Sequence, residues 1–143
     1  MTDALETFDP LARARGRGRR YAVEEYAESR NLTLSRASDL IRLSPEAIRA
    51  LHVANQLYRL PDPSGTGVWR YPQWQFNAQP LRLACLLQMF AESNRWALHS
   101  FMMGRREALD GKSPAEAILD EATDIQLVVN LALMVLQGEQ GAI

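Results

Sequence analysis

The sequence predicts a mainly α-helical chain that contains one small β-hairpin. Helix starts are indicated at Ser44–Glu46 and Ser113–Glu116, where serine is followed directly by proline with a glutamate close behind. Serine is a preferred helix cap, and proline is favoured at the first helical position. A hairpin is indicated because two aromatic runs, residues 57–60 and 68–71, flank the Pro- and Gly-rich residues 61–67.

The composition is that of a globular protein with two differently charged halves. The 143 residues are 47% hydrophobic and 23% charged, which gives enough chain for a core in one or two small domains. Residues 1–82 carry twelve arginines against nine acids, whereas residues 83–143 carry three arginines and Lys112 against eight acids. The asymmetry indicates two surfaces with different partners, and chance variation is the alternative.

The first twenty residues are expected to form a flexible basic arm. Two glycines interrupt a run of arginines at positions 13, 15, 17, 19 and 20. Such an arm suits a phosphate backbone or a minor groove. A solvated tail with no partner is the alternative interpretation.

Residues 21–75 are predicted to form a unit similar to a winged helix-turn-helix. A helix begins at Ala22, a second short helix is capped by Ser35, and a third follows Ser44. The apolar stripe of the third helix is Ala47, Ile48, Leu51 and Ala54. Three short helices followed by a hairpin is the plan of a winged helix-turn-helix. A small helical domain with exposed arginines is the alternative.

The predicted unit supplies a set of DNA-binding candidates. In a helix-turn-helix, the recognition helix presents its N-terminal half to base edges, while phosphate contacts fix its register. Arg49 is the best candidate for reading guanine, because its planar fork matches O6 and N7. The predicted DNA-binding set is Arg15, Arg17, Arg19, Arg20, Arg36, Arg42, Ser44, Glu46, Arg49, His52, Arg59 and Arg70.

Residues 76–143 are predicted to form a second, helical domain. An aromatic connector at residues 72–80 leads into a helix that ends near Ser93 and buries a face made of Leu81, Ala84, Cys85, Gln88 and Met89. Further helices are expected at residues 96–103, ended by Gly104, and at residues 114–119. A last helix is expected to open with a capping box at residues 123–126 and to end at Gln137 and Gly138. Its residues are apolar nearly all round, which predicts burial against another chain as well as its own core.

The most informative motif is Leu109–Pro114, which combines a turn at Asp110-Gly111 with a helix start at Ser113-Pro114. Together with Asn94–Phe101 and the apolar helix that follows, it resembles the toxin-binding domain of the Xre/MbcA/ParS antitoxin family. Arg70–Phe76 is similar to the segment that often precedes that domain. The resemblance covers roughly residues 70–140.

The resemblance implies an antitoxin of a type II toxin–antitoxin system. Such a protein neutralises a cognate RES-type, NAD-targeting toxin by occluding its active site, and represses its own operon by binding operator DNA. A homodimer or higher oligomer in the cytoplasm is expected. Aromatic and Met residues are enriched at interfaces, although a core role is the simpler interpretation for most of them. The predicted toxin-binding set is Trp96, Met102, Met103, Arg105, Arg106, Asp110, Lys112, Gln140 and Ile143.

No catalytic residue, metal or cofactor is predicted. His52 and His99 have no companions at metal-ligand spacing, and neither a Gly-rich phosphate loop nor a Gly-x-Ser-x-Gly elbow is present. Cys85 is predicted to be a small buried core residue. No apolar run reaches the ~20 residues that span a bilayer, and no secretory signal is recognised, so no membrane association is expected.

Two other functions compete with the antitoxin hypothesis. A stand-alone dimeric DNA-binding regulator would use the C-terminal domain only to dimerise, and no toxin gene would lie beside its own. A protein-interaction module with a vestigial N-terminal domain would bind DNA only weakly, with strong salt sensitivity and no sequence preference.

Overall fold

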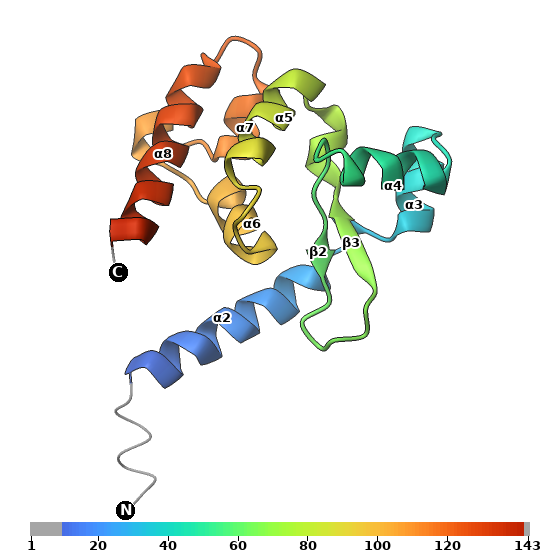
Figure 1. Cartoon of the computed structure of the whole chain (residues 1–143), viewed down its shortest axis with the longest axis horizontal. Helices are drawn as coiled ribbons and strands as arrows, with labels where there is room; N and C mark the ends of the chain where they lie inside the picture. Colours follow the sequence, from blue (N-terminus) through green and yellow to red (C-terminus); the bar gives the residue numbers. More distant parts are fainter. Residues whose placement is uncertain (1–9, 142–143) are drawn as a thin grey trace, which may run out of the picture.

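The computed structural model describes residues 10–141, and side chains to residue 138; within this range the chain is mainly helical with a small antiparallel sheet (Figure 1). Two short 3-10 helices, η1 (Gln73–Asn77) and η2 (Glu107–Leu109), accompany the α-helices and strands. The other elements are α2 (Pro10–Tyr26), β1 (Asn31–Leu32), α3 (Leu34–Ile41), α4 (Pro45–Val53), β2 (Leu60–Pro61), β3 (Trp69–Pro72), α5 (Pro80–Met89), α6 (Arg95–Met103), α7 (Pro114–Leu119) and α8 (Ile125–Gly141).

The sheet contains the predicted hairpin and one strand that was not predicted. β2 pairs antiparallel with β3, with Leu60 opposite Arg70, so the hairpin is confirmed with a first strand shorter than residues 57–60. β1 pairs with the other edge of β3, with Leu32 opposite Tyr71, which gives the order β1-β3-β2. A strand of two residues is too short to show the alternation by which strands are predicted.

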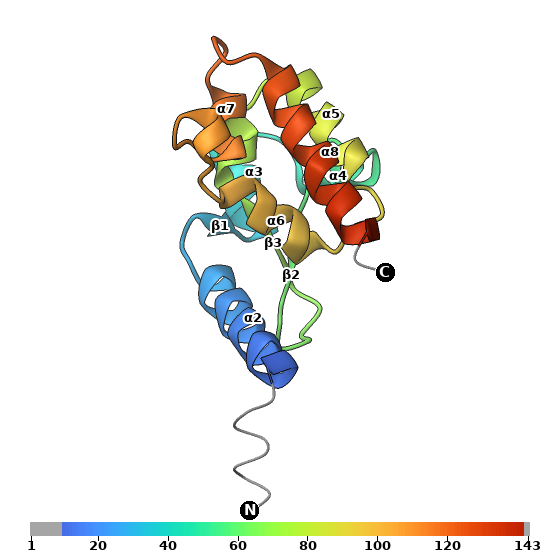
Figure 2. The same ribbon diagram turned by 90° about the vertical axis from the view of Figure 1, so that its left-hand side faces the viewer.

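The expected flexible arm is instead a helix over most of its length. Residues 10–20 form the first part of α2, which projects from the body of the molecule in two perpendicular views (Figures 1 and 2). Alanine and arginine are good helix formers, and here they outweigh the two glycines. Residues 1–9 lie outside the described range.

The caps of α3 and α4 are only partly as predicted. Ser44 caps α4 by accepting from the backbone N–H of Ala47, with Pro45 in the first turn, as expected. The cap of α3 is Thr33 rather than Ser35, because Thr33 precedes the first helical residue and accepts from the Arg36 N–H at 3.2 Å. Between the helices Arg42 adopts the left-handed conformation, with φ of 57°.

The buried face of α5 was wrongly predicted. Its core residues are Leu83, Leu86, Leu87 and Phe90, whereas Leu81 is 78% exposed and Cys85 is exposed. Leucines occur on both sides of this short helix, so the apolar pattern fits two phases about equally well. Cys85 is therefore not a core residue.

The helix after α5 is capped at both ends by small residues. Asn94 accepts from the Trp96 N–H at 2.7 Å at the start of α6. Gly104 ends α6 as expected but with φ of −79°, so it is not a left-handed cap. A Cβ at Gly104 would lie 3.2 Å from the carbonyl oxygen of Ser100, which explains the preference for glycine.

The turn at residues 109–114 is confirmed in detail. Asp110 and Gly111 both lie in the left-handed region, with φ of 56° and 82°. Ser113 and Glu116 form the predicted reciprocal capping box, and Pro114 begins α7. The structure therefore bears out the local chemistry of this motif.

The last helix differs from its prediction at both ends. Asp124 accepts from the Gln126 N–H at 2.9 Å, and the Gln126 side chain donates onward to Asn130, so no capping box forms between residues 123 and 126. The helix also continues past Gly138 to Gly141. Val128 and Ala132 are fully buried, but Met134 is 66% exposed. Within one chain, α8 is therefore buried on one side only.

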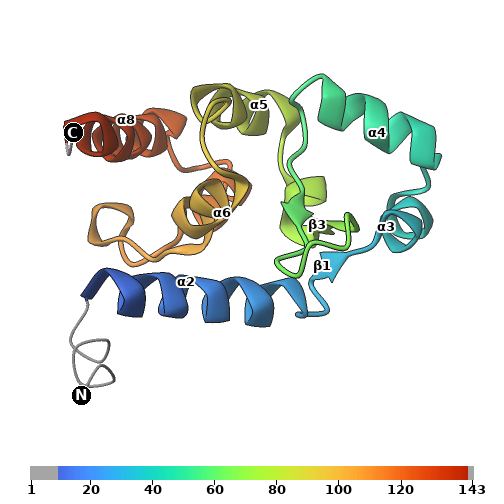
Figure 3. The same ribbon diagram turned by 60° about the horizontal axis from the view of Figure 1, so that its bottom comes forward.

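One hydrophobic core joins the two predicted domains. It includes Ile48 and Tyr58 from the N-terminal part and Leu86, Met102 and Val128 from the C-terminal part. The predicted boundary after residue 75 falls inside η1. Figure 3 shows α5 and α6 on one side of the hairpin and α3 and α4 on the other.

We expect Gly111→Val to lower the free energy of unfolding by about 2 kcal/mol, because a β-branched residue resists φ of 82°. Urea unfolding measures the change. Ala122→Val is the matched control, since Ala122 is exposed and is not among the residues with positive φ. An unchanged midpoint for the Gly111 variant would contradict the assigned role of the turn.

Candidate nucleic-acid and protein interfaces

The exposed face of α4 is a regular stripe. Glu46, Arg49, Ala50 and Val53 are all exposed, and their spacing of three and four residues places them on one side of the helix. Val53 is 83% exposed although it was not predicted as a site residue. Val53 lies seven residues, or two helical turns, after Glu46, and this spacing could have predicted its place on the exposed face. The face combines the guanidinium group of Arg49 with the small apolar side chains of Ala50 and Val53, which suit contacts with thymine methyl groups.

Two predicted members of the recognition helix have other environments. His52 is half-buried and lies off this face; burial, then Arg59 and Arg95, lower its pKa. Ser44 uses its hydroxyl oxygen to cap α4. These two residues are therefore less suited to base contacts than Arg49.

The arginines around α3 and the hairpin divide into free and anchored side chains. Arg36 and Arg42 are exposed. Arg59 stacks over the ring of Trp69 at 4.3 Å, and Arg70 stacks over Tyr26 at 4.5 Å while donating to the Tyr26 carbonyl at 2.8 Å. The hairpin arginines therefore stabilise the hairpin and its contact with α2.

The predicted DNA-binding arginines of α2 lie on its exposed N-terminal part. Arg15, Arg17, Arg19 and Arg20 are all exposed. The C-terminal end of α2 is held to the hairpin loop because the Tyr26 hydroxyl donates to the carbonyl of Val68 at 2.7 Å. α2 and the hairpin loop project on the same side of the body (Figures 1 and 2).

Part of the predicted toxin-binding set lies on α6. Met102 is fully buried in the core and cannot touch a partner, so its place in this set was wrong. Met102 lies four residues after Leu98 and therefore on the same buried side of α6, whereas Met103 is half-buried. Trp96 is also half-buried and meets Tyr21 of α2 edge to face, with ring centroids 6.2 Å apart.

The rest of this set surrounds the turn between α6 and α7. Arg105 and Asp110 are exposed, whereas Arg106 packs over the ring of Phe101 at 5.0 Å. Lys112 forms an ion pair with Asp120 at 2.9 Å. The side chain of residue 140 and all of residue 143, which complete the predicted set, lie outside the described atoms.

A buried polar network joins α2, α6 and the segment before β2. His99 Nε2 lies 2.8 Å from a carboxylate oxygen of Glu25, and His99 Nδ1 lies 2.8 Å from the Tyr58 hydroxyl. Trp74 donates to the same hydroxyl at 3.0 Å, and Arg30 donates to the Glu25 carboxylate from the solvent side. Glu25 and His99 are 74 residues apart, so no local pattern in the sequence reveals this network.

The charge states in this network follow from its hydrogen bonds. Burial alone would raise the pKa of Glu25, but hydrogen bonds from Arg30, His99 and Asn31 outweigh it and hold that pKa below its usual range. Burial lowers the pKa of His99 despite the nearby carboxylate, and burial raises the pKa of Tyr58. A neutral His99 then donates to Glu25 and accepts from Tyr58. Because these groups satisfy one another, the network is a structural tie between elements.

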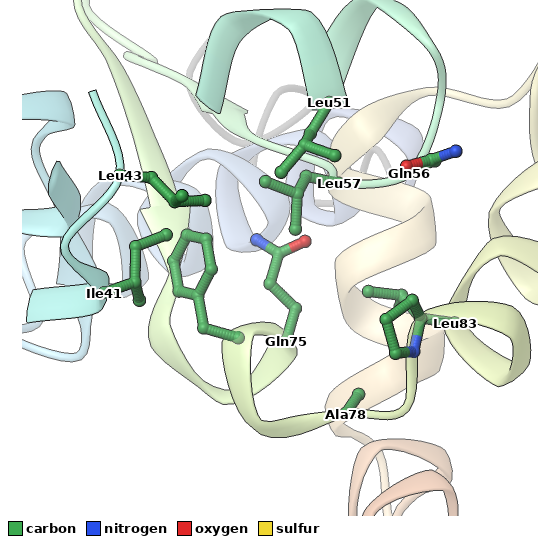
Figure 4. Close-up of a pocket in the computed structure, with 10 residues that line it drawn as sticks. Ile41, Leu43, Leu51, Gln56, Leu57, Gln75, Ala78 and Leu83 are labelled. Carbon is green, nitrogen blue, oxygen red and sulfur yellow. The ribbon is translucent and has the colours of Figure 1, made fainter. Parts of the chain in front are cut away.

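An apolar cavity of about 200 Å³ lies between the α4 side of the fold and the segment from η1 to α5 (Figure 4). Leu43, Leu51, Phe76 and Leu83 are among its lining residues. The Gln75 amide in its wall is already paired with the backbone of Tyr58, at 2.8 and 2.7 Å. The cavity therefore offers an apolar surface rather than a polar binding group.

Comparison with known proteins gives no relative. No protein-family model, no curated protein and no solved structure matches the chain. Among residues 10–141, no group of three His, Cys, Asp or Glu side chains is arranged to hold a metal ion. No helix in that range is long and apolar enough to cross a membrane.

We expect the free energy of unfolding to fall as the solution is acidified. His99 and Glu25 both have lowered pKa values in the folded chain, so the unfolded chain binds protons more strongly. The His99 contribution is complete above its ordinary pKa of 6.5 and is lost below it. The Glu25 contribution follows as the pH falls below 4.5.

Urea unfolding of the wild type and of His99→Gln across this pH range measures the effect. The His99 variant should be less stable at neutral pH and should lose less stability on mild acidification. Equal slopes for the wild type and the His99 variant would contradict the assigned network.

Proposed function

We propose that the protein is a type II antitoxin that binds DNA through its N-terminal elements and a toxin through its C-terminal helices. The observation that carries the DNA-binding half is the order helix, strand, two helices and hairpin, from α2 to β3, with β3 in the centre of the sheet. This order supports a winged helix-turn-helix unit in which α4 is the recognition helix. The free Glu46–Val53 face of α4 suits that role.

The toxin-binding half of the proposal is supported by the capped turn before α7 and by the surfaces around it. The resemblance of this region to the Xre/MbcA/ParS toxin-binding domain points to a RES-type, NAD-consuming toxin. Arg105 and Asp110 are exposed beside the turn, and α8 carries exposed apolar side chains. Neutralisation by occlusion requires only that these surfaces cover the entrance to the toxin's active site.

Co-expression with the product of the neighbouring gene tests the proposal. A stable complex that relieves growth inhibition by that product supports the antitoxin function. A chain that forms no such complex but binds its own promoter would instead be a stand-alone regulator.

We also propose that two copies pair through the outer face of α8. Leu127, Leu131, Met134 and Gly138 recur at spacings of four, three and four residues, which aligns them as a helix-pairing seam with half-buried Leu131 at its border with the core. Residues 125–138 of α8 carry no charge, and nothing lies within 4 Å of a Cβ placed at Gly138. A second copy of α8 would present the same uncharged seam. A dimer would also present two recognition helices to two half-sites.

We expect Arg49→Ala to remove specific operator binding, since a bidentate guanine contact contributes about 1–3 kcal/mol of discrimination. Electrophoretic mobility shift with the promoter of the chain's own operon measures this loss. Toxin binding by the variant should be unchanged, and Arg105→Ala is the matched control with the reverse expectation. Loss of both activities in the Arg49 variant would contradict a separate DNA-binding face.

We expect Met134→Glu to convert the dimer into monomers, because it buries a charge in an uncharged seam. Light scattering after size exclusion measures the mass. Gln126→Glu is the control, since it adds the same charge to an exposed position of α8 away from the seam. A dimer that survives the Met134 substitution would exclude this seam.

A further inference from the structure

The N-terminal part of α2 is an exposed helix with a single sign of charge. Every residue from Pro10 to Tyr21 is exposed, and residues 10–23 include five arginines and no acid. A helix of twelve residues is about 18 Å long. This exposed, uniformly positive segment is a suitable binding surface for a polyanion.

The arginines of this segment form two rows. Arg17 and Arg20 are three residues apart on one side, and Arg15 and Arg19 are four residues apart on the other. At 3.6 residues per turn the two rows are separated by about 150° around the helix axis. A helix with charge on both flanks fits between two lines of phosphates, as in a DNA groove. It lacks the broad apolar face by which basic helices lie on membranes.

The helix is weakly stabilised by its own sequence. Gly16 and Gly18 both lower the stability of the helix relative to alanine. The arginine pairs at spacings of three and four residues repel one another, and residues 14–20 are all exposed. An external source of negative charge would therefore stabilise this segment as a helix.

We propose that the N-terminal part of α2 is a nucleic-acid-binding helix that is stabilised by the phosphates of a DNA duplex. The inference deepens the proposed DNA-binding function and rests on it. The helix has one fixed end, where Tyr21 packs on Trp96, Glu25 bonds to His99 and Tyr26 bonds to the hairpin loop. These contacts hold the C-terminal end of α2 on the body, and the basic N-terminal part projects away from the body (Figures 1 and 2).

The two glycines allow the helical mode to be separated from an extended arm. A Cβ at Gly16 or Gly18 meets nothing within 4 Å, and neither residue has a positive φ, so alanine fits both positions. If the bound form is helical, Gly16→Ala combined with Gly18→Ala should tighten binding several-fold by pre-organising the helix. Gly18→Pro should weaken binding although it leaves every charge in place.

The experiment measures binding of the full chain to a short mixed-sequence DNA duplex by fluorescence anisotropy over a range of salt concentrations. Arg17→Gln combined with Arg20→Gln should weaken binding and reduce the salt slope by up to about 2. Arg105→Gln is the control for loss of an exposed arginine elsewhere. Circular dichroism should show a gain of helix when the duplex is added to the wild type, and a smaller gain for the double alanine variant.

Three results would overturn the inference. If the arginine and glycine variants all bind the duplex like the wild type, α2 is not part of the interface even though the chain binds DNA. If Gly18→Pro is harmless and the alanine variant gains nothing, the segment binds in an extended form. If anionic phosphatidylserine vesicles displace the duplex and induce the same helix, the partner is a membrane. A chain that binds no duplex at all would overturn both this inference and the proposed function.

Discussion

The structure depends on the burial of one carboxylate. Glu25 is only 6% exposed, and an ionised carboxylate in such a position must be paired and hydrogen-bonded to be tolerated. Two of its partners are near in sequence, Arg30 just before β1 and Asn31 in β1, and the third is His99 of α6, 74 residues away. The position of α2 is therefore fixed by the need to satisfy this group, because few other contacts hold the helix to the body.

The same network orders the centre of the fold. His99 is also hydrogen-bonded to the Tyr58 hydroxyl, which accepts a further hydrogen bond from Trp74. The Gln75 side chain accepts from the backbone N–H of Tyr58 and donates to its carbonyl. The segment between α4 and β2 is thereby attached to η1 and α6. A shared polar network and a shared core explain why the basic N-terminal elements and the acidic C-terminal helices form one packed body.

Features that depend on neighbours in the sequence were predicted better than features that depend on distant contacts, although the cap at Ser35 and the capping box at residues 123–126 were wrong. The caps at Ser44 and Ser113 and the left-handed turn at Gly111 follow from side chains within three residues, and the sequence predicts them correctly. The burial of Met102 and the exposure of Cys85 depend on which face of a short helix meets the core. The Glu25–His99 bond spans 74 residues and has no local signature.

The two proposed interfaces meet at the fixed end of α2. Trp96, a predicted toxin contact, has Tyr21 of α2 against its ring, and Tyr21 lies one helical turn before Glu25. A partner that displaces Tyr21 from Trp96 therefore acts on the same turn of helix that holds the buried carboxylate. Because losing that hydrogen-bonded pair would leave a buried charge unsatisfied, displacement of Tyr21 is resisted, and the direction of the basic helix is coupled to the surface of α6.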